Sequence, residues 1–274
     1  MPNKARKLTL QHALKEAMIG PTPDLIASAA GLLPLRKVPR GDGHPVLVLP
    51  GFLSGDMPTW PLRRFLSSIG YHAWPWGLGL NLGISNAYEY DIEALIEHRL
   101  KEIWMESSDQ KISLIGWSLG GVYARELARK YPKLIKDVIT LGSPINGNPG
   151  ETSITKLYSW VTQMQMHDPQ FQEKIQQATS PVPDVPVTAF YSLLDNIVPP
   201  QCARETPGPL VQNIEVDCTH TGFGFNSLVF YLVAHRLAHP LGQPIDAAGL
   251  TRQFQQERLP FSLGRFFSSA QVQS

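Results

Sequence analysis

The sequence predicts an α/β fold in which a mostly parallel, doubly wound sheet carries a helical insertion. Short apolar, β-branched runs alternate with longer amphipathic helical patterns, as in successive βαβ units. Residues 146–186 hold no strand pattern and interrupt this alternation once. The chain of 274 residues is 43% hydrophobic and 17% charged, which is enough apolar material for a large core and excludes a wholly disordered protein.

The first segment, residues 1–43, is predicted to be helical and is locally basic. Leu10, Leu14 and Met18 recur on one helical face, and Thr22-Pro23 is a typical N-cap followed by proline at the first helical position. We expect two helices here that pack on the main domain. The alternative is an arm for dimerisation or for contact with a membrane surface.

The main domain is predicted to comprise residues 44–145 and 187–250. Its first strand, 45–49, is an apolar run that ends at Pro50-Gly51. Strands are also expected over 71–76, 111–115, 137–141, 187–191 and 213–216, and helices over 60–69, 86–105, 118–131 and 228–237. Between the two parts of this domain, 146–186 combines two helical patterns with a proline-rich return, so we predict a cap or lid. Residues 251–274 are expected to form a C-terminal tail.

A candidate nucleophile lies between a predicted strand and the next helix. Gly116-Trp117-Ser118-Leu119-Gly120 fits the pattern G-x-S-x-G, in which a tight turn raises the serine hydroxyl above the edge of the sheet. The amides at the start of the following helix, including that of Leu119, point toward the same place. The alternative is an inert serine at a glycine-lined helix start.

A serine hydroxyl needs a general base at neutral pH. His220 follows the last predicted strand directly, where a parallel sheet presents its chemistry. His235 and His239 lie on or just after a predicted apolar helix, where packing explains them better. His167 lies in the predicted insertion and is an alternative pocket residue.

An acid is needed to orient the base. Asp195 follows the strand 187–191 after a short turn and is our candidate. Asp217 competes with it, but lies so close to His220 in sequence that we expect it to cap its own loop.

Two backbone amides are expected to stabilise a developing oxyanion. One is the amide of Leu119, and the other is that of Phe52, in the loop where Gly51 allows a close approach. An ordinary turn at 50–53 is the alternative. We expect an apolar pocket lined by Leu53, Trp117, Ile145, Trp160, Met164 and Val198, although the residues of the insertion alternatively only pack on the domain.

Five motifs occur in a fixed order: Leu-Pro-Gly-Phe at 49–52, Gly-Trp-Ser-Leu-Gly-Gly at 116–121, Thr-Leu-Gly-Ser-Pro at 140–144, Tyr-Ser-Leu-Leu-Asp-Asn-Ile-Val at 191–198 and Thr-His-Thr-Gly at 219–222. With them the chain resembles the α/β-hydrolase superfamily and, more narrowly, bacterial esterase- and lipase-like serine hydrolases. The loop at 76–83 is similar to that of a subgroup of bacterial hydrolases.

The resemblance implies an enzyme with Ser118 as nucleophile, His220 as base, Asp195 as acid, and Phe52 and Leu119 as oxyanion donors. It implies hydrolysis of carboxylic esters with apolar acyl or alcohol groups through an acyl-enzyme, without a cofactor. An acyltransferase or a thioesterase would use the same triad. A non-catalytic binding module is the alternative from another class.

Composition limits the partners. A net charge of +1 gives no field that would attract nucleic acid, so we expect a small-molecule ester as partner. Cys202 and Cys218 are too few for a cysteine zinc site, and no metal site is predicted. The two cysteines either form a disulfide between the acid and histidine loops or remain thiols.

Membrane contact and an oligomeric state are not indicated. No apolar run is long enough to span a bilayer and the N-terminus is a poor secretory signal, so a cytoplasmic location is expected.

Overall fold

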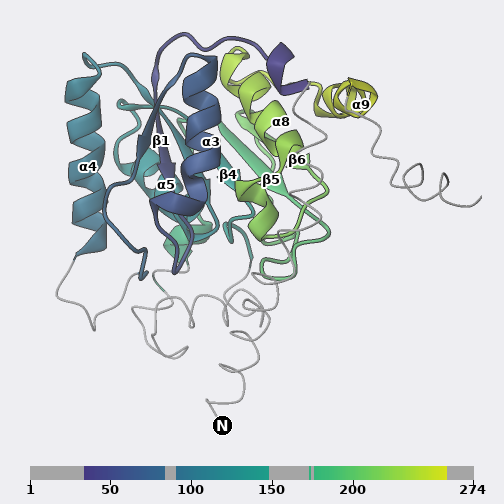
Figure 1. The fold of residues 1–274 in the computed structure, drawn as a ribbon. Helices are drawn as coiled ribbons and strands as arrows, with labels where there is room; N and C mark the ends of the chain where they lie inside the picture. Colours follow the sequence, from purple (N-terminus) through teal and green to yellow (C-terminus); the bar gives the residue numbers. More distant parts are fainter. Residues whose placement is uncertain (1–33, 84–90, 148–172, 174–175, 258–274) are drawn as a thin grey trace, which may run out of the picture.

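The computed structural model describes residues 34–83, 91–147, 173 and 176–257 (Figure 1). The predicted helices before residue 34 and most of the predicted cap or lid lie outside the described residues, as does the end of the predicted tail. The return from the predicted insertion, residues 176–186, is described and includes a helical turn at 176–179.

The described residues form one sheet of six parallel strands, which confirms the predicted α/β class. The order is β2-β1-β3-β4-β5-β6. The strands are β1 Pro45–Leu49, β2 His72–Pro75, β3 Ile112–Trp117, β4 Ile135–Leu141, β5 Val187–Tyr191 and β6 Val211–Glu215. Because β2 lies on one side of β1 and the later strands on the other, the strand order reverses at β1. A parallel sheet presents its ligand sites at the carboxyl ends of the strands beside such a reversal.

Helices cover both faces of the sheet (Figure 1). Helices α3 (Asp56–Ile69) and α8 (Ser227–Ala238) pack on one face, and α4 (Ile92–Glu106) and α5 (Leu119–Lys130) on the other. The alternation along β1 fits this arrangement, since Leu47 and Leu49 join the core beneath α4 and α5 while Val46 and Val48 join the core beneath α3 and α8. Two short 3-10 helices, η1 Pro34–Lys37 and η2 Thr221–Gly224, and a last helix, α9 Ala247–Glu257, complete the described elements.

Three helices differ from the sequence prediction. Helix α4 begins at Ile92, after the extended N-cap Asp91, rather than at the predicted 86. Helix α3 begins at Asp56, four residues before the predicted start at 60. Pro58 obscured this first turn in the sequence, although proline is tolerated there because the first N–H groups of a helix have no intrahelical acceptor. Helix α9 was not predicted and crosses the boundary drawn at 250/251. Its apolar stripe is short: Phe254 is its one buried residue, and Ala247 and Leu250 are only partly buried beside the core.

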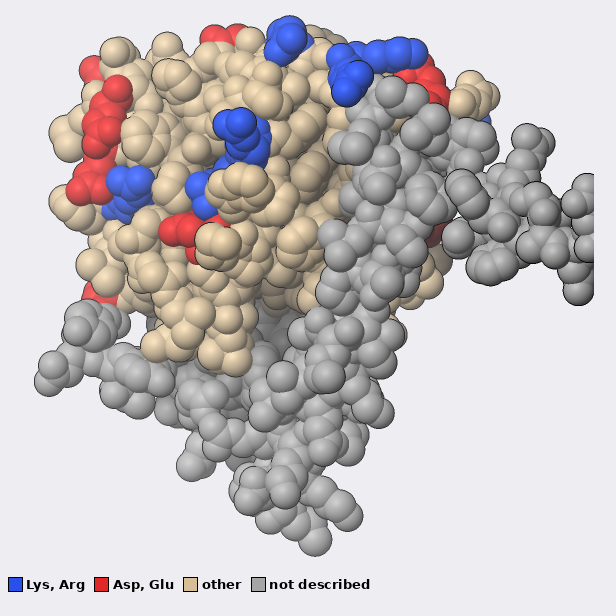
Figure 2. All heavy atoms as spheres, in the orientation of Figure 1, with Lys and Arg blue, Asp and Glu red and all other residues tan. Residues whose placement is uncertain are grey.

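The surface carries charged groups of both signs. On the face seen in Figure 2, the described lysine, arginine, aspartate and glutamate side chains lie in small, mixed groups among larger uncharged areas. No helix within the described residues has the length and apolar character needed to cross a membrane.

Candidate active site

The turn between β3 and α5 holds Ser118 in an unusual backbone conformation, with φ 53° and ψ −121°. Neighbouring glycines make the turn tight: a Cβ on Gly116 would lie 2.3 Å from the Cα of Gly121, and one on Gly120 would lie 2.2 Å from the carbonyl oxygen of Leu49. The Ser118 amide donates to the carbonyl of Leu141 at 2.9 Å, which ties the turn to β4.

The Ser118 side chain is both accessible and uncommitted to the helix. It is half-buried, whereas the other residues from 112 to 123 are buried. Ser118 occupies the N-cap position of α5, but its side chain makes no capping hydrogen bond. Serine at this position normally caps the helix. The turn therefore presents the hydroxyl at the carboxyl edge of the sheet.

Two further predicted residues meet at the same edge. His220 Nδ1 lies 2.7 Å from Asp195 Oδ2, and both residues are buried. The other carboxylate oxygen, Oδ1, accepts from the amides of Ile197 and Val198, each at 2.8 Å. With Asp195 ionised, Nδ1 donates to it and the neutral imidazole keeps Nε2 as an acceptor. The competing Asp217 is exposed.

The histidine loop is attached to the residue next to the serine. The indole Nε1 of Trp117 donates to the carbonyl of His220 at 3.0 Å, and the two ring centroids lie 6.3 Å apart. Trp117 is buried, and this contact with the histidine loop accounts for its polar group. The Trp117 hydrogen bond thus connects the turn that holds Ser118 to the loop that holds His220.

The predicted oxyanion loop also approaches the serine. A Cβ on Gly51 would lie 3.1 Å from Ser118 Cβ and 3.8 Å from Ser118 Oγ. Phe52 follows directly and is half-buried, and Leu119 is the first residue of α5. One predicted donor thus follows a glycine that approaches the serine, and the other follows the serine itself.

The predicted pocket residues have different environments. Leu53 is 49% exposed in the loop beside the serine. Ile145 and Val198 are fully buried in the core beneath α4 and α5. Trp160 and Met164 lie outside the described residues, as does His167.

Both cysteines lie in the loops that hold the acid and the histidine. Cys202 and Cys218 are buried and are present as thiols, so the structure has the thiol alternative rather than the disulfide. The Cys202 carbonyl accepts from the amides of Ile145 and Asn146 at 2.8 and 2.9 Å. This contact joins the loop after β4 to the loop after β5.

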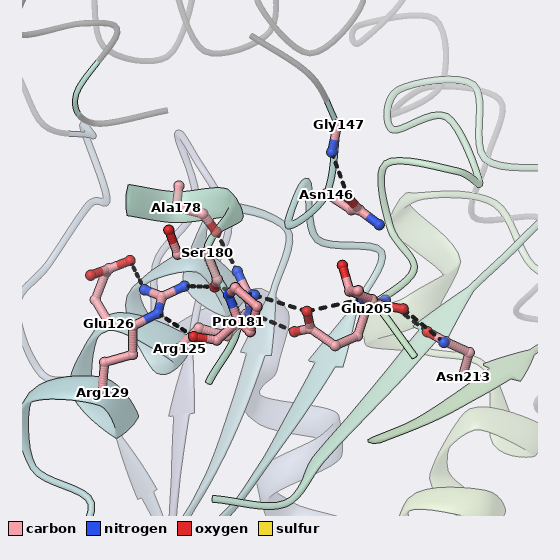
Figure 3. A network of polar contacts seen from close by, with 11 residues as sticks. Arg125, Glu126, Arg129, Asn146, Gly147, Ala178, Ser180, Pro181, Glu205 and Asn213 are labelled. Carbon is pink, nitrogen blue, oxygen red and sulfur yellow. Dashed lines mark hydrogen bonds and ion pairs between the residues drawn. The ribbon is translucent and has the colours of Figure 1, made fainter. Parts of the chain in front are cut away.

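A buried ion pair joins α5 to the segment at Glu205 (Figure 3). Arg125 of α5 donates to both carboxylate oxygens of Glu205, at 2.8 and 3.0 Å, and the two side chains are at most 2% exposed. Arg125 also donates to the carbonyls of Ala178 and Ser180. Asn213 exchanges two hydrogen bonds with the backbone of Glu205. The return from the predicted insertion is thereby fixed to the helix that begins after Ser118.

A Ser–His–Asp contact is present at the other end of β3, at Ser113. His44 Nε2 lies 2.8 Å from Ser113 Oγ, and His44 Nδ1 contacts the carboxylate of Asp42. Ser113 is fully buried within the strand, and burial lowers the pKa of His44. A buried hydroxyl cannot meet a substrate, so this contact serves the packing of the strand. Neither this contact nor the Arg125–Glu205 pair is evident from the sequence, because Ser113 is far from His44 in the chain and Arg125 is far from Glu205.

The comparisons with known proteins agree with this architecture. A family described as the alpha/beta hydrolase fold matches residues 49–194, which is more than half of the chain. Among solved structures, the monoacylglycerol lipase of Paleococcus ferrophilus is 16% identical with a TM-score of 0.51, over 71% of this chain and 95% of the lipase. A mature lipase from Bacillus licheniformis is 14% identical with a TM-score of 0.52, over 73% and 94%. No curated protein matches the chain. These two similarities show a shared fold, and the family match shows that the chain belongs to the alpha/beta hydrolase fold family.

Proposed function

We propose that the protein is a serine hydrolase that cleaves carboxylic esters with apolar acyl or alcohol groups through an acyl-enzyme. Ser118 is the nucleophile, His220 the general base and Asp195 the orienting acid. The amides of Phe52 and Leu119 stabilise the oxyanion. Membership of the alpha/beta hydrolase fold family supports a hydrolase role in general, and the ester substrate and the mechanism are part of the proposal.

The reaction follows from the roles of these groups. Ser118 Oγ attacks the ester carbonyl while His220 Nε2 accepts its proton. The tetrahedral intermediate then expels the alcohol, which takes that proton, and the acyl group remains on Ser118. Water attacks the acyl-enzyme with His220 again as base, which releases the acid and restores the serine. Asp195 stabilises the imidazolium in both halves of the reaction.

The observation that carries the proposal is the buried His220–Asp195 pair. It is hydrogen-bonded to Trp117, the residue that directly precedes a strained and accessible serine. An inert serine at the start of a helix would need neither the strain nor the adjacent acid–base pair. The pair also leaves Nε2, the atom that general-base catalysis requires, as the acceptor of the ring.

Loss of the hydroxyl tests the proposal. The Ser118→Ala variant should lose turnover of p-nitrophenyl esters and covalent labelling by a fluorophosphonate probe, while its thermal unfolding stays close to that of the wild type. A loss of about 10⁴-fold or more is expected for a triad nucleophile.

Ser113 provides a matched control, because its hydroxyl contacts a histidine that contacts an aspartate, away from the proposed site. Ser113→Ala should keep both labelling and turnover. Retained turnover in Ser118→Ala, or an equal loss in Ser113→Ala, would contradict the assignment.

A further inference from the structure

We propose that Asn81 is a positioning residue that holds the oxyanion loop in its working geometry. This inference rests on the proposed function. Asn81 is fully buried and lies in the glycine-rich loop after β2, far in sequence from the serine. It makes hydrogen bonds on both sides of Phe52, the proposed oxyanion donor.

Three hydrogen bonds join Asn81 to the loop at 50–54. Its side-chain Nδ2 donates to the carbonyl of Pro50 at 2.8 Å. Its carbonyl accepts from the amide of Leu53 at 2.7 Å, and its own amide donates to the carbonyl of Ser54 at 2.8 Å. One residue thus fixes backbone groups that precede and follow Phe52.

The asparagine side chain is itself held in one orientation. Its Oδ1 accepts from the amide of Gly83 at 3.1 Å and lies 3.4 Å from the hydroxyl of Tyr123 on α5. These donors assign Oδ1 as the acceptor, so Nδ2 must face Pro50. An amide with both a donor and an acceptor is required here, and an aspartate would turn an acceptor toward the Pro50 carbonyl.

The position of this loop matters because it touches the serine. Gly51, between Pro50 and Phe52, approaches Ser118 closely enough that a Cβ on it would lie 3.1 Å from Ser118 Cβ. An oxyanion donor acts only when it points to the place where charge develops, and a shift of about 1 Å in such a group can cost about 100-fold in rate. Asn81 should therefore affect the chemical step far more than substrate binding.

The test compares Asn81→Ala with Asn213→Ala, using p-nitrophenyl butyrate turnover, fluorophosphonate labelling and thermal unfolding. Asn213 is a matched control because its side chain also bridges a loop through two backbone hydrogen bonds, at Glu205 and away from the oxyanion loop. Asn81→Ala should lower kcat by about 10- to 100-fold with KM changed by less than about twofold. Its labelling should be slower but reach the wild-type extent. Asn213→Ala should lower the melting temperature and keep kcat.

The isosteric variant Asn81→Asp keeps the size of the side chain and provides the same test where the alanine variant does not fold. Its kcat should fall at least as far as in Asn81→Ala, because the carboxylate cannot donate to Pro50 and places negative charge near the oxyanion. An active wild type whose Asn81 variants keep kcat, or whose Asn213→Ala variant loses kcat equally, overturns the positioning role alone. A wild type that neither turns over esters nor takes the label overturns the proposed function and this role together.

Discussion

Ser118 holds a backbone conformation that its own Cβ opposes, so replacing it with glycine should stabilise the fold while abolishing the proposed activity. The φ of 53° and ψ of −121° lie in a region that glycine adopts readily and L-residues rarely adopt. Ser118→Ala is the reference variant, because alanine also lacks the hydroxyl but keeps the Cβ. The serine caps no helix amide, so neither variant loses a cap.

The expected magnitude follows from two opposing effects. A non-glycine residue in a sparsely populated backbone region costs about 1–3 kcal/mol. Glycine recovers this, but its greater freedom in the unfolded chain offsets about 0.4–1 kcal/mol of the gain. Ser118→Gly should therefore be more stable than Ser118→Ala by about 1 kcal/mol, which corresponds to about 2–4 °C in melting temperature for a domain of this size.

Urea denaturation followed by circular dichroism measures the difference directly. Both variants should give the same slope against urea, so that the midpoints report stability alone. A glycine variant that is less stable than the alanine variant would refute the reasoning, because it would mean that the turn imposes no strain on residue 118.

Three other perturbations test contacts elsewhere in the structure. Glu205→Gln should destabilise the fold by about 3–5 kcal/mol in urea denaturation, because it leaves the buried Arg125 charge without its carboxylate. Trp117→Phe should lower stability by about 1–2 kcal/mol and also lower ester turnover, because the His220 carbonyl loses its indole donor. Burial raises the pKa of Asp137, so the folded state binds more protons than the unfolded state and stability is lost as the pH rises through the folded pKa. Asp137→Asn should therefore gain stability relative to the wild type as the pH rises above about 4, and a stability difference that does not change with pH would contradict this.

All six strands lie within two residues of their predicted ends, and two of them coincide with the prediction. Strands β1 and β5 coincide with the predicted ranges 45–49 and 187–191, and every residue in both is buried. An unbroken apolar run bounded by proline leaves little choice of register. The edge strand β6 begins two residues before the predicted start, at Val211 rather than Asn213, because its partly exposed residues do not stand out from the adjacent loop.

The candidate site was predictable as far as it depends on local sequence. The G-x-S-x-G pattern encodes a turn, and the turn is present with its glycines in close contact. Asp195 and His220 follow strands, and their loops meet because the carboxyl ends of parallel strands share one edge. The hydrogen bonds that Asn81 and Trp117 make were not predicted from the sequence. Each donates to a backbone carbonyl far away in sequence, and no periodicity or motif reveals which carbonyl that is.

In the part of the chain that the structure describes, Ser113 contacts one histidine–aspartate pair and Ser118 follows Trp117, which is hydrogen-bonded to another, so residue identity alone cannot locate an active site. Ser113 is fully buried in β3, where the hydrogen bond to His44 satisfies its hydroxyl. Ser118 is held in a strained turn, is accessible, and leaves the helix start uncapped. Folding alone gives no reason to retain the strain or the missing cap, since a glycine at 118 would relieve the strain and an ordinary N-cap geometry would restore the cap. The surrounding glycines and the hydrogen bond to Leu141 maintain this strain. A requirement on the hydroxyl explains it better than folding does, so we assign the chemistry to Ser118.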